Sequence, residues 1–392
     1  MKAGNSLLNK FIILVLTGLT SIAFSSGPGK KTLNVGVVLR LNDKYNSTVS
    51  SLDTGIEVAK VLFEKEHPAV RINLKRYSIG EDLASSMTAS AKIIEDKIPA
   101  AIGGEYSEES IVLGERLGQQ KIIFITPTSS SPAVTENRPY TFRACFSDTV
   151  VAEKLSDFLV QKFKPKAVGL IHNLSSPYTD FLSKKFLETY DSHMAKEPEN
   201  KRVPIYEEKI LKDNQDFTSQ IDHFIEKNVT HVVMLTHEND FLRFALQAAN
   251  KKFFPIYVGS DGWGPNNKVF ENFVKNSTYG DRFIAYRNSY WKEDSQSPRS
   301  KLFKAAYEKQ IGRQPSAWSA VSFDAAWILF TAMDKVHNLK DGDEIQREMK
   351  KLKNLALVTS DHFTFGSDNS PRKDLQIYRI DKGGINYEAT LK

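Results

Sequence analysis

Cysteine is almost absent from this chain. Cys145 is the only one in 392 residues, so no disulfide can close within the chain and the fold must rest on a hydrophobic core. The composition, 41% hydrophobic and 11% aromatic, is typical of a globular protein with such a core. Because Cys145 lies between the apolar Ala144 and Phe146, we expect a small buried side chain there and not a reactive thiol.

An excess of charge of one sign is also lacking. The net charge is +6, and Lys2 and Lys10 lie in the N-terminal leader, which leaves +4 on the rest of the chain. Basic and acidic residues are interspersed and form no basic stripe. We therefore expect no nucleic-acid partner and interpret the charge as a contribution to solubility.

Long apolar runs are confined to the N-terminus. Residues 11–24 form an apolar run of about 14 residues, below the roughly 20 that cross a bilayer. Lys2 and Lys10 precede this run. Ala23-Phe24-Ser25 has the small-residue spacing of a cleavage site, so residues 1–25 are predicted to be a signal peptide cleaved near Ser25. The alternative is an uncleaved anchor. No cysteine lies near this site, which argues against a lipid-anchored form.

Four N-x-S/T sequons would fit a glycosylated ectodomain; they are at Asn46, Asn173, Asn228 and Asn276. Such ectodomains usually contain disulfides, so we interpret the sequons as chance in a chain rich in Asn, Ser and Thr. The leader and the single cysteine together favour a soluble, monomeric protein of a Gram-negative periplasm.

Catalytic motifs are missing as well. The chain has no G-x-S-x-G, no P-loop and no H-E-x-x-H. Residues 370–373 match S-x-x-K but form a proline-containing turn and not a helix start. His231 and His237 flank a predicted strand and do not share a helical face, so a metal pair is not expected. We predict a protein that is not an enzyme and uses no cofactor or metal.

What the chain does contain is a regular alternation of apolar strands and amphipathic helices. Between residues 33 and 125 the pattern is β-α-β-α-β-α-β, which predicts a parallel sheet with helices on both faces. The pattern restarts near residue 149 and runs to residue 264. The remainder is less regular: a long helix is predicted at 317–339, and residues 363–365 and 375–379 are predicted to form a hairpin-like pair.

The most informative feature is a set of hydroxyl-rich strand ends. The strand at 100–102 runs into Gly103-Gly104 and then a polar turn that opens a helix, and the strand at 122–125 ends in the turn 126–131. Ligands of open α/β sheets bind beyond the carboxyl ends of the strands, and helix N-termini favour anions. These residues therefore predict one half of a cleft that holds a small molecule by its carboxylate.

Six segments carry a resemblance to a known family. They are AAIGGEYSEES, IIFITPTSSSPAVTE, YTFRACFSD, VGLIHNLSSPYTDFL, IYVGSDGWG and FTFGSDNSPRKDLQIYRI. In this order and spacing, from about residue 33 to 380, the chain resembles the leucine/isoleucine/valine-type periplasmic binding proteins of type I fold, which feed ABC importers. The resemblance implies two α/β lobes with parallel central sheets, joined by a three-strand hinge that closes on ligand. It divides the chain into lobe I (32–148 and 288–355) and lobe II (149–287 and 356–392).

The resemblance also implies roles for particular positions. Ser107 and Ser130 match positions whose hydroxyls hold an α-carboxylate, and Thr128 matches one that does so through its backbone. Tyr178 matches a second-lobe aromatic beside the ligand, and Asp261 matches an acid that pairs with an α-ammonium. His237 falls where the family often has an aromatic.

Each of these residues also has a plainer interpretation. Ser107 could cap a helix, Ser130 and Asp261 could be turn residues, and Tyr178 could be ordinary packing. Trp263, two residues after Asp261, could line the pocket or pack inside its lobe. A buried zwitterion nevertheless needs several donors at one end and an acid at the other, and these residues supply both.

The chain departs from the family at two places. Residues 65–68 stand where relatives have a glycine-rich turn, and the first loop, 40–51, lacks the usual Gly and Pro and carries Arg40, Asp43, Lys44 and Tyr45. We expect a solute receptor for an amino acid or a related carboxylate, which docks on an ABC permease of the inner membrane. The alternative is a sensory or scaffolding envelope protein of the same fold.

Overall fold

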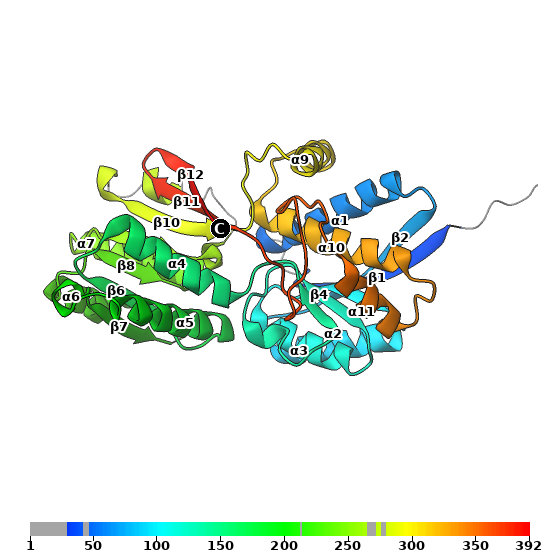
Figure 1. Ribbon diagram of the computed structural model, residues 1–392, viewed down its shortest axis with the longest axis horizontal. Coiled ribbons are helices and arrows are strands. Elements are labelled where there is room, and N and C mark those ends of the chain that lie inside the picture. Colours follow the sequence, from blue (N-terminus) through cyan, green and yellow to red (C-terminus); the bar gives the residue numbers. More distant parts are fainter. Residues whose placement is uncertain (1–29, 42–46, 212–213, 265–271, 276–279) are drawn as a thin grey trace, which may run out of the picture.

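The computed structural model describes residues 30–41, 47–211, 214–264, 272–275 and 280–392 (Figure 1). The predicted signal peptide, three residues of the first loop (Asp43, Lys44 and Tyr45) and the sequons at Asn46 and Asn276 lie outside these ranges. The described chain forms two sheets that lie side by side, each with its own helices (Figure 1).

The first sheet is parallel throughout, in the order β2-β1-β3-β4-β5. Its strands are β1 (Lys31–Leu39), β2 (Val70–Ser78), β3 (Ala100–Gly103), β4 (Ile123–Thr126) and β5 (Thr141–Arg143). Every residue of β3, β4 and β5 is buried, which is why β3 and β4 read as nearly continuous apolar runs and not as alternating ones.

The second sheet has the order β12-β11-β10-β9-β8-β6-β7. Its strands are β6 (Val168–Asn173), β7 (Ile205–Ile210), β8 (His231–Met234), β9 (Ile256–Gly259), β10 (Ile284–Ser289), β11 (Leu375–Asp381) and β12 (Gly384–Leu391). The strands from β7 to β10 are parallel, and β11 and β12 extend the sheet as antiparallel neighbours. The predicted α/β class with parallel central sheets is confirmed, with this antiparallel extension added.

Helices cover both faces of each sheet. Around the first sheet lie α1 (Ser47–Glu66), α2 (Leu83–Glu95), α3 (Ser107–Gly118), α10 (Ala317–Lys335) and α11 (Gly342–Lys351), with α9 (Pro298–Ile311) packed on α1. Around the second lie α4 (Asp148–Phe163), α5 (Pro177–Met194), α6 (Thr218–Glu226) and α7 (Glu238–Asn250). Among the described residues, no helix combines the length and the apolarity that crossing a membrane requires.

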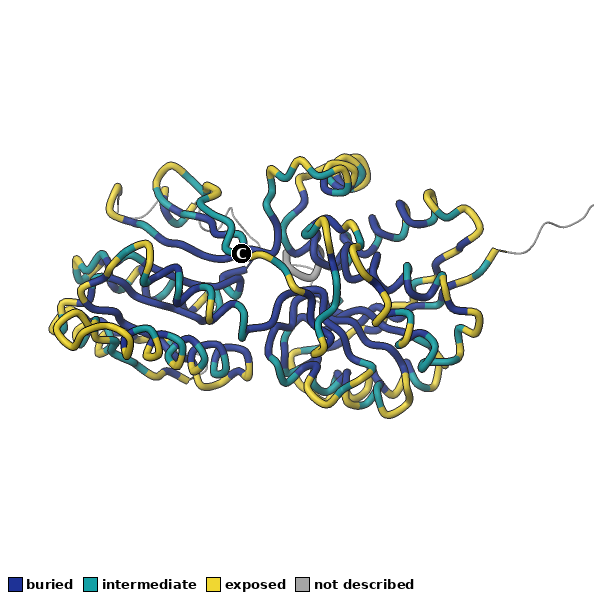
Figure 2. The backbone as a smooth tube through the Cα atoms, viewed as in Figure 1, coloured by how far each residue is buried: buried dark blue, intermediate teal, exposed yellow. Residues whose placement is uncertain are grey.

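The chain passes between the two sheets three times: after β5, after β10 and before β11 (Figure 1). Most of α10 is buried, and it packs against α1 and the first sheet. The tube is coloured as buried along the strands and where the two halves meet, while exposed residues lie on the outer helices and turns (Figure 2). The lobe boundaries inferred from the resemblance stay a prediction.

The C-terminal hairpin differs from the prediction. Residues 363–365 do not pair with 375–379; Phe363 and Phe365 make only isolated bridges, to Leu355 and Pro371. Strand β11 instead pairs with β12 across the turn at Lys382-Gly383, where the Asp381 carboxylate accepts a bond from the Gly383 N–H at 2.8 Å. The Gly383-Gly384 pair is a turn signal that the sequence interpretation missed, and it also missed β12, β5 and α11.

Candidate functional site

The ends of β3 and β4 meet at the edge of the first sheet that faces the second. The Ser107 hydroxyl, at the start of α3, accepts a bond from the Ser131 N–H at 3.3 Å, and the Thr128 hydroxyl donates to the Glu105 carbonyl at 2.9 Å. Ser107, Thr128 and Ser130 are each at most 6% exposed. The three residues predicted to hold a carboxylate are therefore close together, on two turns that hydrogen-bond to each other.

Two glycines make the turn after β3 possible. Gly103 and Gly104 have φ values of +151° and +71°, which side chains rarely tolerate. A Cβ on Gly103 would lie 2.0 Å from the Val38 carbonyl oxygen, and one on Gly104 would lie 2.1 Å from the Ser110 hydroxyl. Only glycine lets the chain turn this tightly against β1 and deliver Ser107 to the sheet edge.

A buried arginine shapes the turn after β4. The Arg143 guanidinium, at the end of β5, donates to the carbonyls of Ser129 at 3.3 Å and Ser131 at 2.9 Å, and to the carbonyl of Ser130. It also donates to the Thr135 hydroxyl at 2.8 Å. Since the Ser129 carbonyl points to Arg143, the Ser130 N–H of the same peptide plane points away from it. The Ser131 N–H bonds the Ser107 hydroxyl, and Pro132 has no N–H, so the Ser130 N–H is the donor that this arrangement directs outward from the turn.

On the opposite side, Tyr178 and Asp261 lie at the ends of the second sheet. Tyr178 is in the first turn of α5, whose start is set by Pro177 and by the Ser176 hydroxyl. Its hydroxyl is 2.6 Å from that of Ser260 and accepts a bond from the Gly262 N–H at 3.2 Å. These bonds fix the Tyr178 ring beside Asp261, directly after β9.

Asp261 is buried and joins the two sheets through Tyr290. The Asn288 amide donates to Asp261 Oδ1 at 3.1 Å, and the Tyr290 hydroxyl donates to Oδ2. The same Tyr290 hydroxyl lies 3.4 Å from the Thr128 carbonyl oxygen. Burial raises the pKa of Asp261, while the bonds from Tyr290 and Asn288 lower it in part. The predicted acid thus lies one side chain away from the predicted carboxylate-binding turn.

An aromatic contact also joins the ends of the two sheets. The Tyr106 ring, just before α3, meets the His237 ring edge-on with centroids 5.5 Å apart, and the centroid of the Tyr178 ring also lies 5.5 Å from that of His237. The Arg40 guanidinium lies over Tyr106 at 4.5 Å and forms an ion pair with the buried Glu109 carboxylate at 2.5 Å. His237 therefore packs against aromatic rings from both sides of the junction, and its place beside the solute stays a prediction.

This packing makes stability depend on pH through His237. Burial lowers the pKa of His237 to about 4, and the nearby Arg40 charge acts in the same direction. The unfolded chain binds this proton near pH 6.5, so the stabilisation is complete above pH 6.5 and is lost as the pH falls towards 4. The His237 side chain is partly exposed, and solvent screening reduces the effect of the pKa change on stability. We therefore expect the unfolding free energy to fall by about 2 kcal/mol.

Urea unfolding at pH 7 and pH 4.5 measures this loss. His237→Asn should reduce the difference between the two unfolding free energies, whereas the same change at the exposed His362 should not. An unchanged difference in His237→Asn would mean that this ring does not titrate with folding.

A second acid, Asp148, lies beside the same turn and was not predicted. It begins α4, its backbone N–H donates to the Ser130 carbonyl at 2.9 Å, and its side chain is fully buried. Burial raises its pKa well above the usual range and the Asp261 charge raises it further, while the Ser130 hydroxyl lowers it. Burial therefore disfavours the ionised form of Asp148 relative to that of an exposed carboxyl group.

Three other residues singled out in the sequence lie away from the site or inside a core. Trp263 is fully buried and stacks on Phe241 with centroids 3.7 Å apart, and its Nε1 donates to the Met234 carbonyl at 3.0 Å, so it packs its lobe. Cys145 is a buried thiol, as predicted, and burial raises its pKa to about 12. Lys373 of the S-x-x-K motif is buried in an ion pair with Asp324.

The structure brings together all six residues predicted for the site. It adds Tyr106, Arg143, Asp148, Asn288 and Tyr290, which sequence reasoning missed. Tyr290 follows the end of β10, and the rule that pointed to Asp261 after β9 would have found it. Arg143 carried no such signal, since its role depends on carbonyls 12 to 14 positions earlier in the chain and on a hydroxyl 8 positions earlier. Within the described ranges, no group of three or more His, Cys, Asp or Glu side chains is arranged to hold a metal.

Comparison with known proteins gives one family. A family model described as periplasmic binding protein matches residues 32–385. The Leu/Ile/Val-binding protein homolog 3 of Brucella melitensis biotype 1 is 23% identical over 163 residues, which are 40% of this chain and 44% of that relative. The chain thus matches less than half the length of this curated relative.

Two solved structures share the fold. The leucine binding protein LivK from Thermotoga maritima superposes with a TM-score of 0.80 at 19% identity and covers 92% of this chain and 99% of its own. A solute binding protein of an ABC transporter from R. palustris, in complex with benzoate, superposes with a TM-score of 0.74 at 14% identity. The match covers 92% of this chain and 96% of that protein. At these identities the likeness shows a common type I architecture.

Proposed function

This chain belongs to the periplasmic binding protein family, and we propose that it captures an amino acid or a related small carboxylate between its two lobes and delivers it to an ABC importer. Family membership confirms that the protein binds solutes and is not an enzyme. The periplasm is the compartment that the family description names, and the predicted leader, residues 1–25, would direct the chain there.

One observation carries the proposal. The Tyr290 hydroxyl touches both the Thr128 carbonyl of the hydroxyl-rich turn and the Asp261 carboxylate of the other lobe. A zwitterionic solute needs donors at one end and an acid at the other within a few ångströms, because a buried charge without a partner is costly. The junction offers both within the span of one tyrosine side chain.

The roles follow from this arrangement. Ser107, Ser130 and the backbone at Thr128 would hold the solute's carboxylate, and Asp261 would pair with its ammonium group. Tyr178 and His237 would flank the rest of the solute. Burial disfavours the ionised form of Asp148, which would reduce its repulsion of the carboxylate beside Ser130.

Closure of the lobes would complete the site. Tyr106 and His237 come from different lobes and meet edge-on at 5.5 Å, so their contact forms as the lobes approach. Solute held between them would favour the closed form over the open one, and the closed form would dock on the permease.

The solute is identified by thermal unfolding of the purified protein, with any bound solute removed first by unfolding and refolding. Leucine, isoleucine and valine form one arm of the screen, other amino acids a second, and benzoate a third. A solute at about a hundred times its dissociation constant should add roughly 2.7 kcal/mol to the unfolding free energy.

We expect α-amino acids to raise the unfolding free energy. Their decarboxylated amines should not, because they lack the carboxylate that the serine turns would bind. A shift from benzoate alone would assign the site to aromatic carboxylates and remove the role of Asp261 in pairing with an ammonium. No shift in any arm would contradict the proposed capture of small carboxylates.

A further inference from the structure

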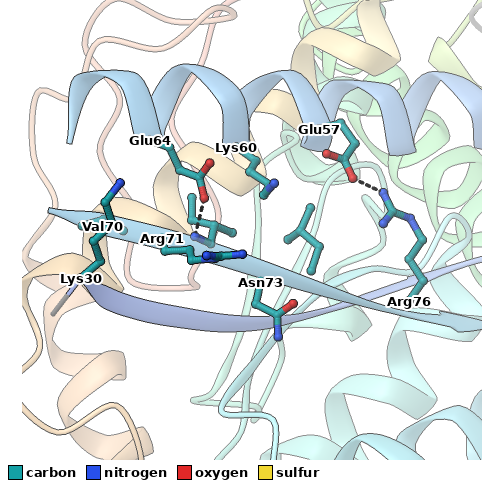
Figure 3. A pocket seen from close by; sticks show the side chains of 10 residues that line it. Lys30, Glu57, Lys60, Glu64, Val70, Arg71, Asn73 and Arg76 are labelled. Atoms are coloured by element: carbon teal, nitrogen blue, oxygen red, sulfur yellow. Dashed lines mark hydrogen bonds and ion pairs between the residues drawn. The ribbon is translucent and has the colours of Figure 1, made fainter. Parts of the chain in front are cut away.

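A groove of about 480 Å³ lies between α1 and β2 (Figure 3). Strand β2 is the outermost strand of the first sheet and pairs with β1 alone among the described strands. In the ribbon view, β2 lies at the far end of its half of the molecule from β6, β7 and β8 (Figure 1). An occupant of this groove would therefore leave the proposed solute site accessible.

The groove carries more positive than negative charge. Its ionised side chains are Lys30, Lys60, Arg71, Arg76, Glu57 and Glu64. Arg76 is neutralised, since its guanidinium bonds Asp53 Oδ1 at 3.0 Å and also pairs with the Glu57 carboxylate. Lys30, Lys60 and Arg71 have no carboxylate within 4 Å in the described ranges, so three cations line the groove without an ion-pair partner.

The groove offers little apolar surface to hold a small molecule. Val70 and Ile72 in its floor are only 3% and 2% exposed. Ligand pockets for small molecules are mostly apolar with few polar groups, and this groove has the opposite composition. Its three cations are spread over α1, β2 and the residue before β1, and this spacing suits an elongated anion better than a compact one.

The sheet edge itself is partly closed. The Glu64 carboxylate accepts a bond from the Ile72 N–H at 2.6 Å, which Figure 3 shows as a dashed line from α1 down to β2. That N–H is one of the groups that an added strand would need. An occupant is thus recognised by its charges and not by strand addition.

We propose that this groove docks an extended acidic segment of a partner protein, whose carboxylates pair with Lys30, Lys60 and Arg71. Charge complementarity selects the segment and gives fast, salt-sensitive association. Because the groove is remote from Tyr290 and Asp261, docking is compatible with both solute capture and lobe closure.

The experiment measures fluorescence anisotropy of a labelled octaglutamate peptide titrated with the purified protein at several salt concentrations. The groove variant combines Lys30→Gln, Lys60→Gln and Arg71→Gln. A matched control variant removes the same charge from exposed lysines elsewhere, through Lys196→Gln, Lys301→Gln and Lys353→Gln. We expect the groove variant to bind the peptide at least about tenfold more weakly than the control variant, and the affinity of the unmodified protein to fall as salt rises.

Equal weakening in both variants would show that the peptide senses net charge alone and would overturn the proposal, as would absence of binding at low salt. Inorganic phosphate is the second probe. If phosphate displaces the peptide better than chloride at equal ionic strength, the groove is a phosphate site and not a docking site for an acidic segment. Thermal unfolding checks that the groove variant is folded, and Lys60→Glu alone repeats the test with a single change at a half-buried side chain.

Discussion

Replacing Asp261 by asparagine is expected to lower the affinity for an α-amino acid by about a hundredfold or more. The carboxylate is buried and would be the only charged group that faces the solute's ammonium in the proposed pose. Truncating one partner of a buried, hydrogen-bonded charge pair costs about 2–5 kcal/mol, and 2.7 kcal/mol corresponds to a hundredfold change. Calorimetric titration with the solute found in the thermal screen measures the change.

Asparagine keeps the shape of the side chain: its Oδ1 can still accept the bond from Asn288, and its Nδ2 can donate to the Tyr290 hydroxyl, whose own proton then faces the Thr128 carbonyl oxygen. The fold should therefore survive, and removal of a buried charge that lies near Asp148 can even raise the unfolding free energy of the solute-free protein. Asp148→Asn is the buried comparison, and Asp281→Asn, at a side chain that is 84% exposed, is the surface control. Both should bind within about threefold of the unmodified protein.

The outcome separates two classes of solute. A protein whose solute has no ammonium group should bind as well or better after Asp261→Asn, because the change removes a negative charge near the solute's carboxylate. Unchanged affinity for an α-amino acid would show that Asp261 does not pair with the ammonium. The role of Asp261 would then be limited to its hydrogen bond with Tyr290, which joins the lobes.

The second large effect is expected at the buried ion pair of Asp324 and Lys373. The two side chains are 0% and 2% exposed, with 3.8 Å between Lys373 Nζ and Asp324 Oδ2. Asp324, on α10, accepts bonds from the N–H groups of Val358 at 2.8 Å and Thr359 at 3.0 Å. Lys373 donates to the Ala144 carbonyl at 2.8 Å, so this pair ties α10 to two of the segments that pass between the sheets.

Asp324→Ala should lower the unfolding free energy by about 3–5 kcal/mol, because it leaves the Lys373 ammonium buried without its counter-charge. In thermal unfolding this corresponds to a drop of roughly 6–10 °C. The double variant Asp324→Ala/Lys373→Met should recover part of the loss, since it removes the orphaned charge as well.

Lys292 and Asp294 provide a matched control. Their N···O distance is also 3.8 Å, but the side chains are 38% and 69% exposed. Lys292→Met should change the unfolding free energy by less than about 1 kcal/mol. A loss at Asp324 no larger than that at Lys292 would mean that the buried pair contributes nothing specific to the junction.

Much of the fold could be predicted because its signals are local. The strands β3, β4 and β8 are short, mostly apolar runs, β1 shows alternation over residues 33–39, and the helices between them repeat apolar residues at helical spacing. Where the signal was weak the prediction was wrong. Strand β12 has no fully buried residue and so no apolar run, and the apolar residues at 363–365 predict a strand pair where the structure has only isolated bridges of Phe363 and Phe365.

The sequence by itself determined that strand ends would carry the site. Ser107, Thr128 and Asp261 follow buried strands, and Tyr178 starts a helix after another, so parallel topology brings them to facing edges. Only the tertiary structure decided how these edges are joined. Tyr290 is 162 positions from Thr128 and 29 from Asp261, and Tyr106 meets His237 from the other lobe. Such contacts depend on how two separately formed sheets meet. Periodicity along the chain carries no information about the relative position of the two sheets.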